Sequence, residues 1–195
     1  MRAVPPLDGR PIILRFRPRL SALRGRLLSG GSSEHAAGKP VWAGSFIRRR
    51  LTVLDRELLE HESALRGILI HELFHFAWVR AGNPVRRSYG AMLALEAAAS
   101  ARGEVGESSE VQKQVWRAAA AGTGGARGRA KRKVDALEAG ARAWADYVCE
   151  SFCDTAAWAL CPRAPWPVSL APRWQRKRRQ WFREWVSEQV GGVRI

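Results

Sequence analysis

The chain has 195 residues, of which 46% are hydrophobic, and a formal net charge of +15 at pH 7. This length and apolar content predict a single domain over residues 1–195 and exclude an intrinsically disordered chain. Arginine supplies 28 of the 33 basic residues. A bias in overall composition produces such a charge as readily as a nucleic-acid partner does, so the charge alone indicates no partner.

Targeting segments and disulfide bonds are not expected. Residues 1–20 contain no apolar run of signal-peptide length, because several arginines interrupt them. No stretch reaches the roughly 18 apolar residues that a membrane-spanning helix needs. The three cysteines are odd in number and lie within a short region, at Cys149, Cys153 and Cys161. This pattern favours reduced thiols in a cytoplasmic protein over a disulfide framework.

The beginning of the chain predicts little regular structure. Residues 1–44 are expected to form an irregular N-terminal segment rich in proline, arginine and glycine. Within it, the sequence favours a short edge strand at residues 11–16, one or two helical turns at residues 21–28 and a loop at residues 29–40.

A strand and a central helix are expected next. Residues 45–54 alternate unevenly between apolar and arginine side chains, which predicts a strand that ends at Asp55. A helix is expected over residues 62–81, because this stretch is apolar nearly all round and Gly82-Asn83-Pro84 is a strong stop signal. Its buried side is expected to carry six residues: Leu65, Ile68, Leu69, Leu73, Phe76 and Ala77.

This helix contains the motif His71-Glu72-Leu73-Phe74-His75. Residues four apart lie on the same helix face, so His71 and His75 can direct two imidazoles at one ion. Glu72 follows the first histidine, where its carboxylate can reach a water molecule on that ion without being a ligand. The pattern is typical of zinc hydrolases, in which the glutamate is the general base.

The remainder of the chain predicts four more helices, at residues 91–101, 110–121, 134–160 and 173–190. Residues 103–133 are expected to form a flexible, loop-rich insertion, and the basic, glycine-rich part at 122–133 favours a surface loop over a nucleic-acid-binding tail. Residues 173–190 form a basic C-terminal helix. Its tryptophans lie near one face, which favours packing in the core over stacking on bases.

A catalytic zinc ion needs a third protein ligand, and no histidine follows His75. Glu96 and Glu150 are the two alternatives. Glu96 is nearer, 21 residues after His75, whereas Glu150 is followed four residues later by Asp154 on the same helix face. This favours Glu150, since a metal-bound histidine usually has a carboxylate or carbonyl behind its second nitrogen.

Together, the His71-Glu72-x-x-His75 and Glu150-x-x-x-Asp154 motifs resemble those of the gluzincin metallopeptidases, the thermolysin-like group and its single-domain relatives, the minigluzincins. The resemblance implies an α+β, mostly helical, zincin-like core with a small N-terminal sheet packed on the active-site helix. It also implies that Glu150 is the third zinc ligand and that Asp154 accepts the second N–H of His71. The spacing departs from the pattern, because Glu150 follows His75 by 75 residues.

The expected function is therefore that of a cytoplasmic zinc metallopeptidase, with Glu72 as general base and a peptide or protein as substrate. Zinc peptidases commonly bind an extended substrate along a strand such as the one at residues 45–54. Tyr147 is the first choice for an oxyanion donor, with Tyr89 or an arginine as alternatives. The alternative function is a nucleic-acid-associated protein with a structural or vestigial zinc site, which would bind through its basic surface.

Overall fold

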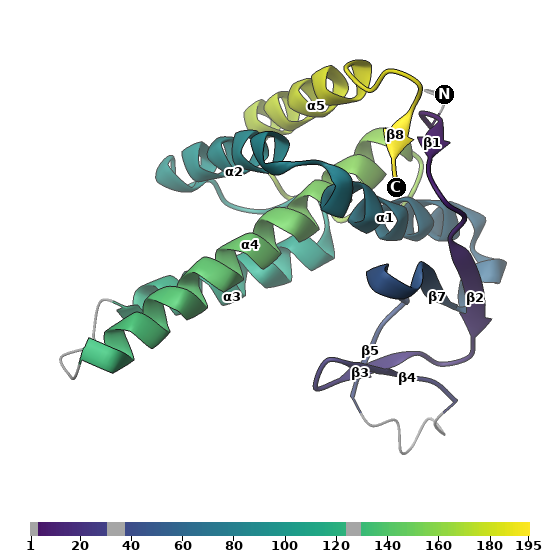
Figure 1. Ribbon diagram of the computed structural model, residues 1–195, viewed down its shortest axis with the longest axis horizontal. Coiled ribbons are helices and arrows are strands. Elements are labelled where there is room, and N and C mark those ends of the chain that lie inside the picture. The colour runs from purple at the N-terminus through teal and green to yellow at the C-terminus, as the bar shows by residue number, and fades with distance from the viewer. Residues whose placement is uncertain (1–3, 31–37, 124–129) are drawn as a thin grey trace.

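The computed structural model of the protein describes residues 4–30, 38–123 and 130–195. The fold is α+β, as expected, and mostly helical (Figure 1). The described residues contain five α-helices: α1 (Glu62–Arg80), α2 (Asn83–Ala98), α3 (Glu107–Thr123), α4 (Ala130–Leu160) and α5 (Pro172–Ser187). No described helix has the length and apolar character needed to cross a membrane.

The sheet nearest to α1 has three strands in the order β2 (Ile13–Arg17), β7 (Leu51–Asp55), β6 (Ala43–Phe46). The central strand β7 is buried along its whole length and pairs parallel with β2 and antiparallel with β6. β6 is an edge strand and contacts α1, where the Ser45 hydroxyl donates a hydrogen bond to the Glu72 carbonyl at 3.3 Å. The edge of the sheet therefore runs beside the helix that carries the motif.

The prediction for the N-terminal segment was wrong in two respects. Residues 21–28 are not helical turns but a hairpin of β3 (Ser21–Leu23) and β4 (Arg26–Leu28), which β5 (Lys39–Pro40) extends. Arg24 and Gly25 have φ values of 49° and 74°, the left-handed pair that a two-residue hairpin turn requires. The described part of residues 1–44 is consequently not irregular, because it contains most of the strands. The expected edge strand at residues 11–16 is β2.

Two further strands join distant parts of the chain. β1 (Leu7–Asp8) pairs parallel with β8 (Val193–Arg194), which no sequence pattern predicted. The predicted strand over residues 45–54 is divided, because Ile47–Arg49 forms a 3₁₀ turn, η1, between β6 and β7. A second 3₁₀ turn, η2 (Arg56–Glu60), leads into α1.

Helix α1 has the predicted bounds to within one residue, but the predicted buried side is only partly right. Phe76 and Ala77 are buried, whereas Leu65, Ile68, Leu69 and Leu73 are only partly buried. The core that α1 shares with α4 and α5 contains Ala77 together with three residues that were not predicted to be buried, Ile70, Phe74 and Trp78. The half-buried side borders a cleft, to which Ile68 contributes.

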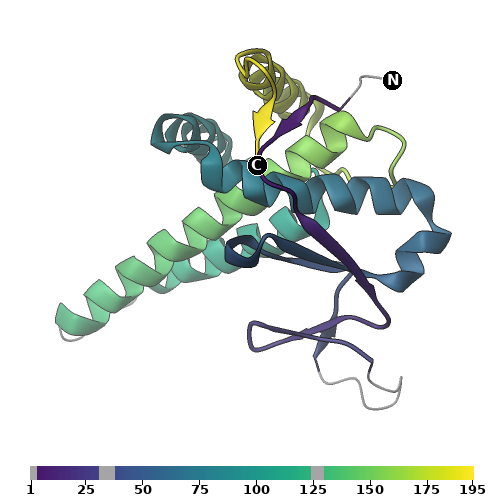
Figure 2. The same cartoon turned by 45° about the vertical axis from the view of Figure 1, so that its right-hand side comes forward.

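The second half of the chain contains more helix than expected. Pro84 does not end the helical region; it stands in the first turn of α2, where a missing N–H does no harm. The stretch 103–133 is not mainly loop, because α3 occupies most of it and packs along α4 as a long helical hairpin (Figures 1 and 2). Residues 124–129, the centre of the expected basic loop, lie outside the described residues.

Helix α5 carries Trp174 and Trp185 into the core, as predicted, whereas Trp181 packs against the core partly buried. Trp174 and Trp185 are only 6% and 5% exposed, and Phe182 packs against Phe74 and Phe152. These rings are therefore not available to stack on nucleic-acid bases.

Candidate metal centre

Helices α1 and α4 bring three ligating side chains to one point. The Nε2 atom of His71 lies 3.2 Å from Nε2 of His75 and 3.2 Å from Oε2 of Glu150. The Nε2 atom of His75 lies 3.8 Å from Oε1 of Glu150. Ligands about 2.0–2.1 Å from a tetrahedral ion are roughly 3.3–3.4 Å apart. The separations of the three side chains are thus close to those around a single tetrahedral ion, with the His75–Glu150 distance somewhat longer.

Asp154 lies directly behind His71. Its Oδ1 atom is 2.8 Å from Nδ1 of His71, and its Oδ2 atom accepts a hydrogen bond from the Ser109 backbone N–H at 2.8 Å. The carboxylate is buried, so it holds the proton on Nδ1 and leaves the Nε2 lone pair for an ion. Gly106, just before α3, allows this approach, because a Cβ atom there would overlap the Asp154 carboxylate.

His75 has sulfur atoms behind it instead of a carboxylate. Its Nδ1 atom lies 3.5 Å from Sγ of Cys149 and 3.4 Å from Sγ of Cys153. These two thiols and His75 form a second group whose ligating atoms lie within 4.8 Å of one another. That the cysteines lie behind His75 was not predicted from the sequence. Their spacing of four residues, each one position before Glu150 or Asp154, was the signal that they share this face of α4.

Glu72 lies in the same group as the two histidines. One of its carboxylate oxygens and one ring nitrogen of each of His71 and His75 fall within 4.8 Å of one another. Glu72 is only 7% exposed. Its carboxylate is thus held next to the point where the three ligands meet.

The electrostatics of the group favour a bound cation. Burial by itself would lower the pKa of His71, but the Asp154 and Glu150 carboxylates raise it well above its ordinary value. Burial would raise the pKa of Glu150, but the two histidines lower it. Cys153 and His75 lower the pKa of the Cys149 thiol to about 6, although burial opposes this shift. The acidic groups therefore make the site attractive to positive charge. Without a metal ion, protons on the histidines supply that charge.

The ligands line a cleft that extends to both sides of them. A cavity of about 530 Å³ lies on one side and a cavity of about 410 Å³ on the other, and His71, Glu72 and Glu150 line both. Ala43 of the edge strand β6 also lines both cavities. A chain of several residues could therefore lie along β6 and pass over the ligands.

The other residues considered from the sequence are not brought to this point. The Tyr147 hydroxyl donates to Oε1 of Glu104 at 2.6 Å, and the Tyr89 hydroxyl donates to the Ser151 carbonyl at 2.9 Å. Both tyrosines are buried, so neither faces the cleft as an oxyanion donor. Glu96, the alternative third ligand, instead accepts two hydrogen bonds from Arg178.

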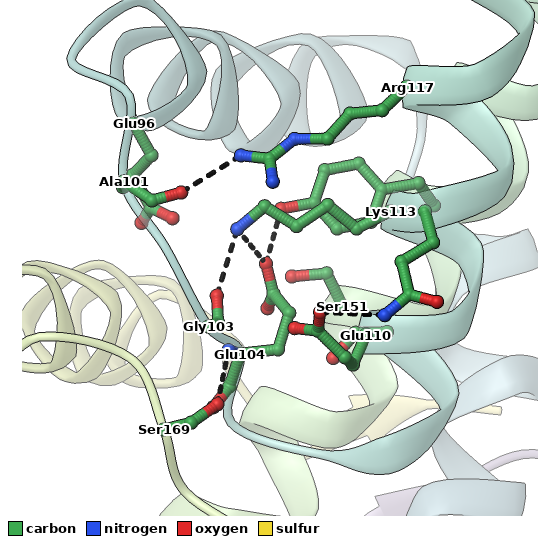
Figure 3. Close-up of polar contacts among 12 residues, drawn as sticks. Glu96, Ala101, Gly103, Glu104, Glu110, Lys113, Arg117, Ser151 and Ser169 are labelled. Atoms are coloured by element: carbon green, nitrogen blue, oxygen red, sulfur yellow. Dashed lines mark hydrogen bonds and ion pairs between the residues drawn. The ribbon is translucent and has the colours of Figure 1, made fainter.

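A buried network of charged groups anchors helix α4 beside this site. Arg178 of α5 donates to Glu96, to Glu104 and to the hydroxyl of Ser151, the residue after Glu150. Lys113 of α3 adds a 2.9 Å contact to Glu104 and donates to the Gly103 carbonyl (Figure 3). Two cations and two carboxylates thus compensate one another and tie α2, α3, α4 and α5 together.

No family model matches the chain, and no curated protein or solved structure matches it either. The function is therefore inferred from the geometry of the chain itself.

Proposed function

We propose that the protein is a zinc-dependent metallopeptidase of the gluzincin type, with His71, His75 and Glu150 as metal ligands. The observation that carries the proposal is the meeting of these three side chains beside Glu72 in one cleft, although 75 residues separate His75 from Glu150. The sheet beside α1 would then belong to a zincin-like core. The free thiols of all three cysteines support a reducing compartment such as the cytoplasm.

The donor set suits zinc. Two imidazole nitrogens and one carboxylate oxygen are the ligands of many catalytic zinc sites, which keep a further position open for water. A bound zinc ion would lower the pKa of that water to about 7 and polarise the scissile carbonyl.

The chain's own residues have distinct parts in the reaction. Glu72 accepts a proton from the attacking water and passes it to the leaving amine. Asp154 keeps His71 in the tautomer that leaves Nε2 free. The edge strand β6 pairs with the substrate backbone and presents the peptide bond to Glu72. Tyr147 has no role in this proposal, because its hydroxyl is bonded to Glu104.

Metal analysis and peptide cleavage test the proposal together. The purified protein should contain about one zinc ion per chain. Glu72→Gln should keep the zinc and lower the cleavage rate by at least about 100-fold, since it removes only the general base. Glu150→Ala should lose both zinc and activity. Glu62→Gln, an exposed change on the same helix, serves as the control and should alter neither.

Two results would contradict the proposal. Full zinc content in Glu150→Ala would exclude Glu150 as a ligand. Unchanged cleavage by Glu72→Gln would exclude Glu72 as the base.

A further inference from the structure

A third cavity, of about 740 Å³, is lined by five arginines and one acidic side chain, Asp8. We call it the arginine pocket, and its arginines are Arg10, Arg48, Arg50, Arg80 and Arg194. They come from the segment after β1, the region of η1, the end of α1 and strand β8. The pocket is therefore assembled by folding from four separate parts of the chain.

The pocket has an excess of positive charge, because its five arginines share it with one acidic side chain, Asp8, and the C-terminal residue Ile195. None of the five arginines lies within ion-pair distance of a carboxylate in the described part of the chain. Burial lowers the pKa of Arg50, and the neighbouring positive charges of Arg80 and Arg10 lower it further. An anion placed between these arginines would offset their positive charges.

Arg50 forms the fixed base of the pocket. Its Nε atom donates to the Pro11 carbonyl at 3.1 Å, a second nitrogen donates to the Arg10 carbonyl, and the guanidinium lies 5.6 Å from the centre of the Phe76 ring. Arg48 and Arg80 are exposed and can turn toward a ligand. The pocket thus combines one oriented guanidinium with exposed ones, an arrangement suited to carboxylates.

The arginine pocket adjoins the metal-centre cleft. Ile47 and Val79 line both the pocket and the 410 Å³ cavity that contains His75. Along the chain, β6 leads directly into Ile47 and Arg48. The turn η1, which carries Arg48, follows the end of β6. A substrate paired with β6 rises about 3.3 Å per residue, so about three residues beyond Ser45 span roughly 10 Å toward this turn and the pocket.

We propose that the arginine pocket binds acidic side chains of a peptide substrate, about three residues from the bond that is cut. This inference rests on the proposed peptidase function. It assigns a substrate class, a polypeptide with aspartate or glutamate on one side of the cleavage site. The carboxylates pair with Arg48 and Arg80 at the mouth of the pocket, above Arg50.

Paired peptides test the preference. Two fluorogenic peptides of equal length are compared, one with glutamates three to five residues from the scissile bond and one with glutamines there. We expect kcat/KM to favour the acidic peptide roughly tenfold through KM, as a pair of charge-assisted contacts would give. The advantage should decrease as salt is raised. Arg48→Gln/Arg80→Gln should remove this advantage, so that the acidic and the neutral peptide are cleaved with similar kcat/KM.

The matched control is Arg49→Gln/Arg87→Gln. It removes the same charge from two exposed arginines outside the pocket, one of them adjacent to Arg48, and should preserve the preference. Equal cleavage of both peptides by the wild type, or the same loss in the control, would overturn the proposal.

A binding measurement separates this proposal from the peptidase function. Fluorescence anisotropy with the zinc-loaded Glu72→Gln protein needs no cleavage. Tighter binding of the acidic peptide that depends on Arg48 and Arg80 would support the pocket even if no peptide were cut. Binding independent of these arginines would overturn it. Tighter, arginine-dependent binding of a single-stranded oligonucleotide of equal charge would also overturn it, in favour of a nucleic-acid ligand.

Discussion

His75 lies between two groups of ligating atoms, one at each ring nitrogen. Its Nε2 atom faces His71 and Glu150, and its Nδ1 atom faces the sulfurs of Cys149 and Cys153. An ion on Nε2 leaves the proton on Nδ1, which then donates to sulfur. The thiols therefore have the orienting role for His75 that Asp154 has for His71.

Removal of both thiols should weaken metal binding without removing a ligand. We expect Cys149→Ala/Cys153→Ala to lower zinc affinity by about tenfold, the lower end of the range for lost orienting groups. Competition with a chelator measures this, and Cys161→Ala is the control. Cobalt-substituted wild-type protein should lack a sulfur-to-metal charge-transfer band. Such a band would mean that the sulfurs themselves bind the ion, contrary to this account.

Among the elements, α4 supplies most of the site. It carries Glu150, Asp154 and both orienting cysteines, and with 31 residues it is roughly 46 Å long. Its second half lies in the core, and Arg178 of α5 fixes that half through Ser151. The position of Glu150, the proposed third ligand, thus depends on an ion-pair network that touches none of the proposed ligands directly.

Substitution of Arg178 should lower the stability of the folded protein. Arg178→Met leaves the buried carboxylates of Glu96 and Glu104 without their main partner, and we expect it to lower the free energy of unfolding by about 3–5 kcal/mol. Denaturant titration measures the change. The exposed control Arg176→Met should change it by less than about 0.5 kcal/mol. Equal effects of the two substitutions would show that the network contributes nothing.

At the scale of the whole molecule, acid should destabilise the folded protein by protonating Glu104 in the same network. Burial would raise the pKa of Glu104, but Arg178, Lys113 and the Tyr147 hydroxyl lower it from 4.5 to about 2. As the pH falls, the Glu104 carboxylate is therefore protonated in the unfolded chain before it is protonated in the folded chain. The resulting stabilisation is complete above about pH 4.5 and is lost as the pH falls to about 2, with a size on the order of 3 kcal/mol.

The test is the pH dependence of the free energy of unfolding. Between pH 4.5 and 2, Glu104→Gln should show a flatter dependence than the wild type, because it lacks this proton uptake. Glu62→Gln changes an exposed carboxylate and should keep the wild-type slope. A wild-type slope in Glu104→Gln would contradict the prediction.

Local patterns explain what the sequence could predict. Helix α1 and its histidine pair follow from apolar periodicity and a stop signal within some twenty residues, and the Glu150 and Asp154 pair follows from helix spacing. The positions of Cys149 behind His75 and of Arg178 beside Glu96 depend on contacts between distant helices, which no local pattern encodes. The hairpin at Arg24-Gly25 was missed because arginine rarely occupies a left-handed turn position.

Gly106 has a consequence for recognising relatives of this chain. Any side chain at this position would displace Asp154, and with it the start of α3. A homologous sequence that keeps both histidines, Glu150 and Asp154 should therefore also have glycine here, three residues before the amide that holds the aspartate. A search pattern built on this glycine would distinguish relatives with an intact site from sequences that share only the short histidine motif.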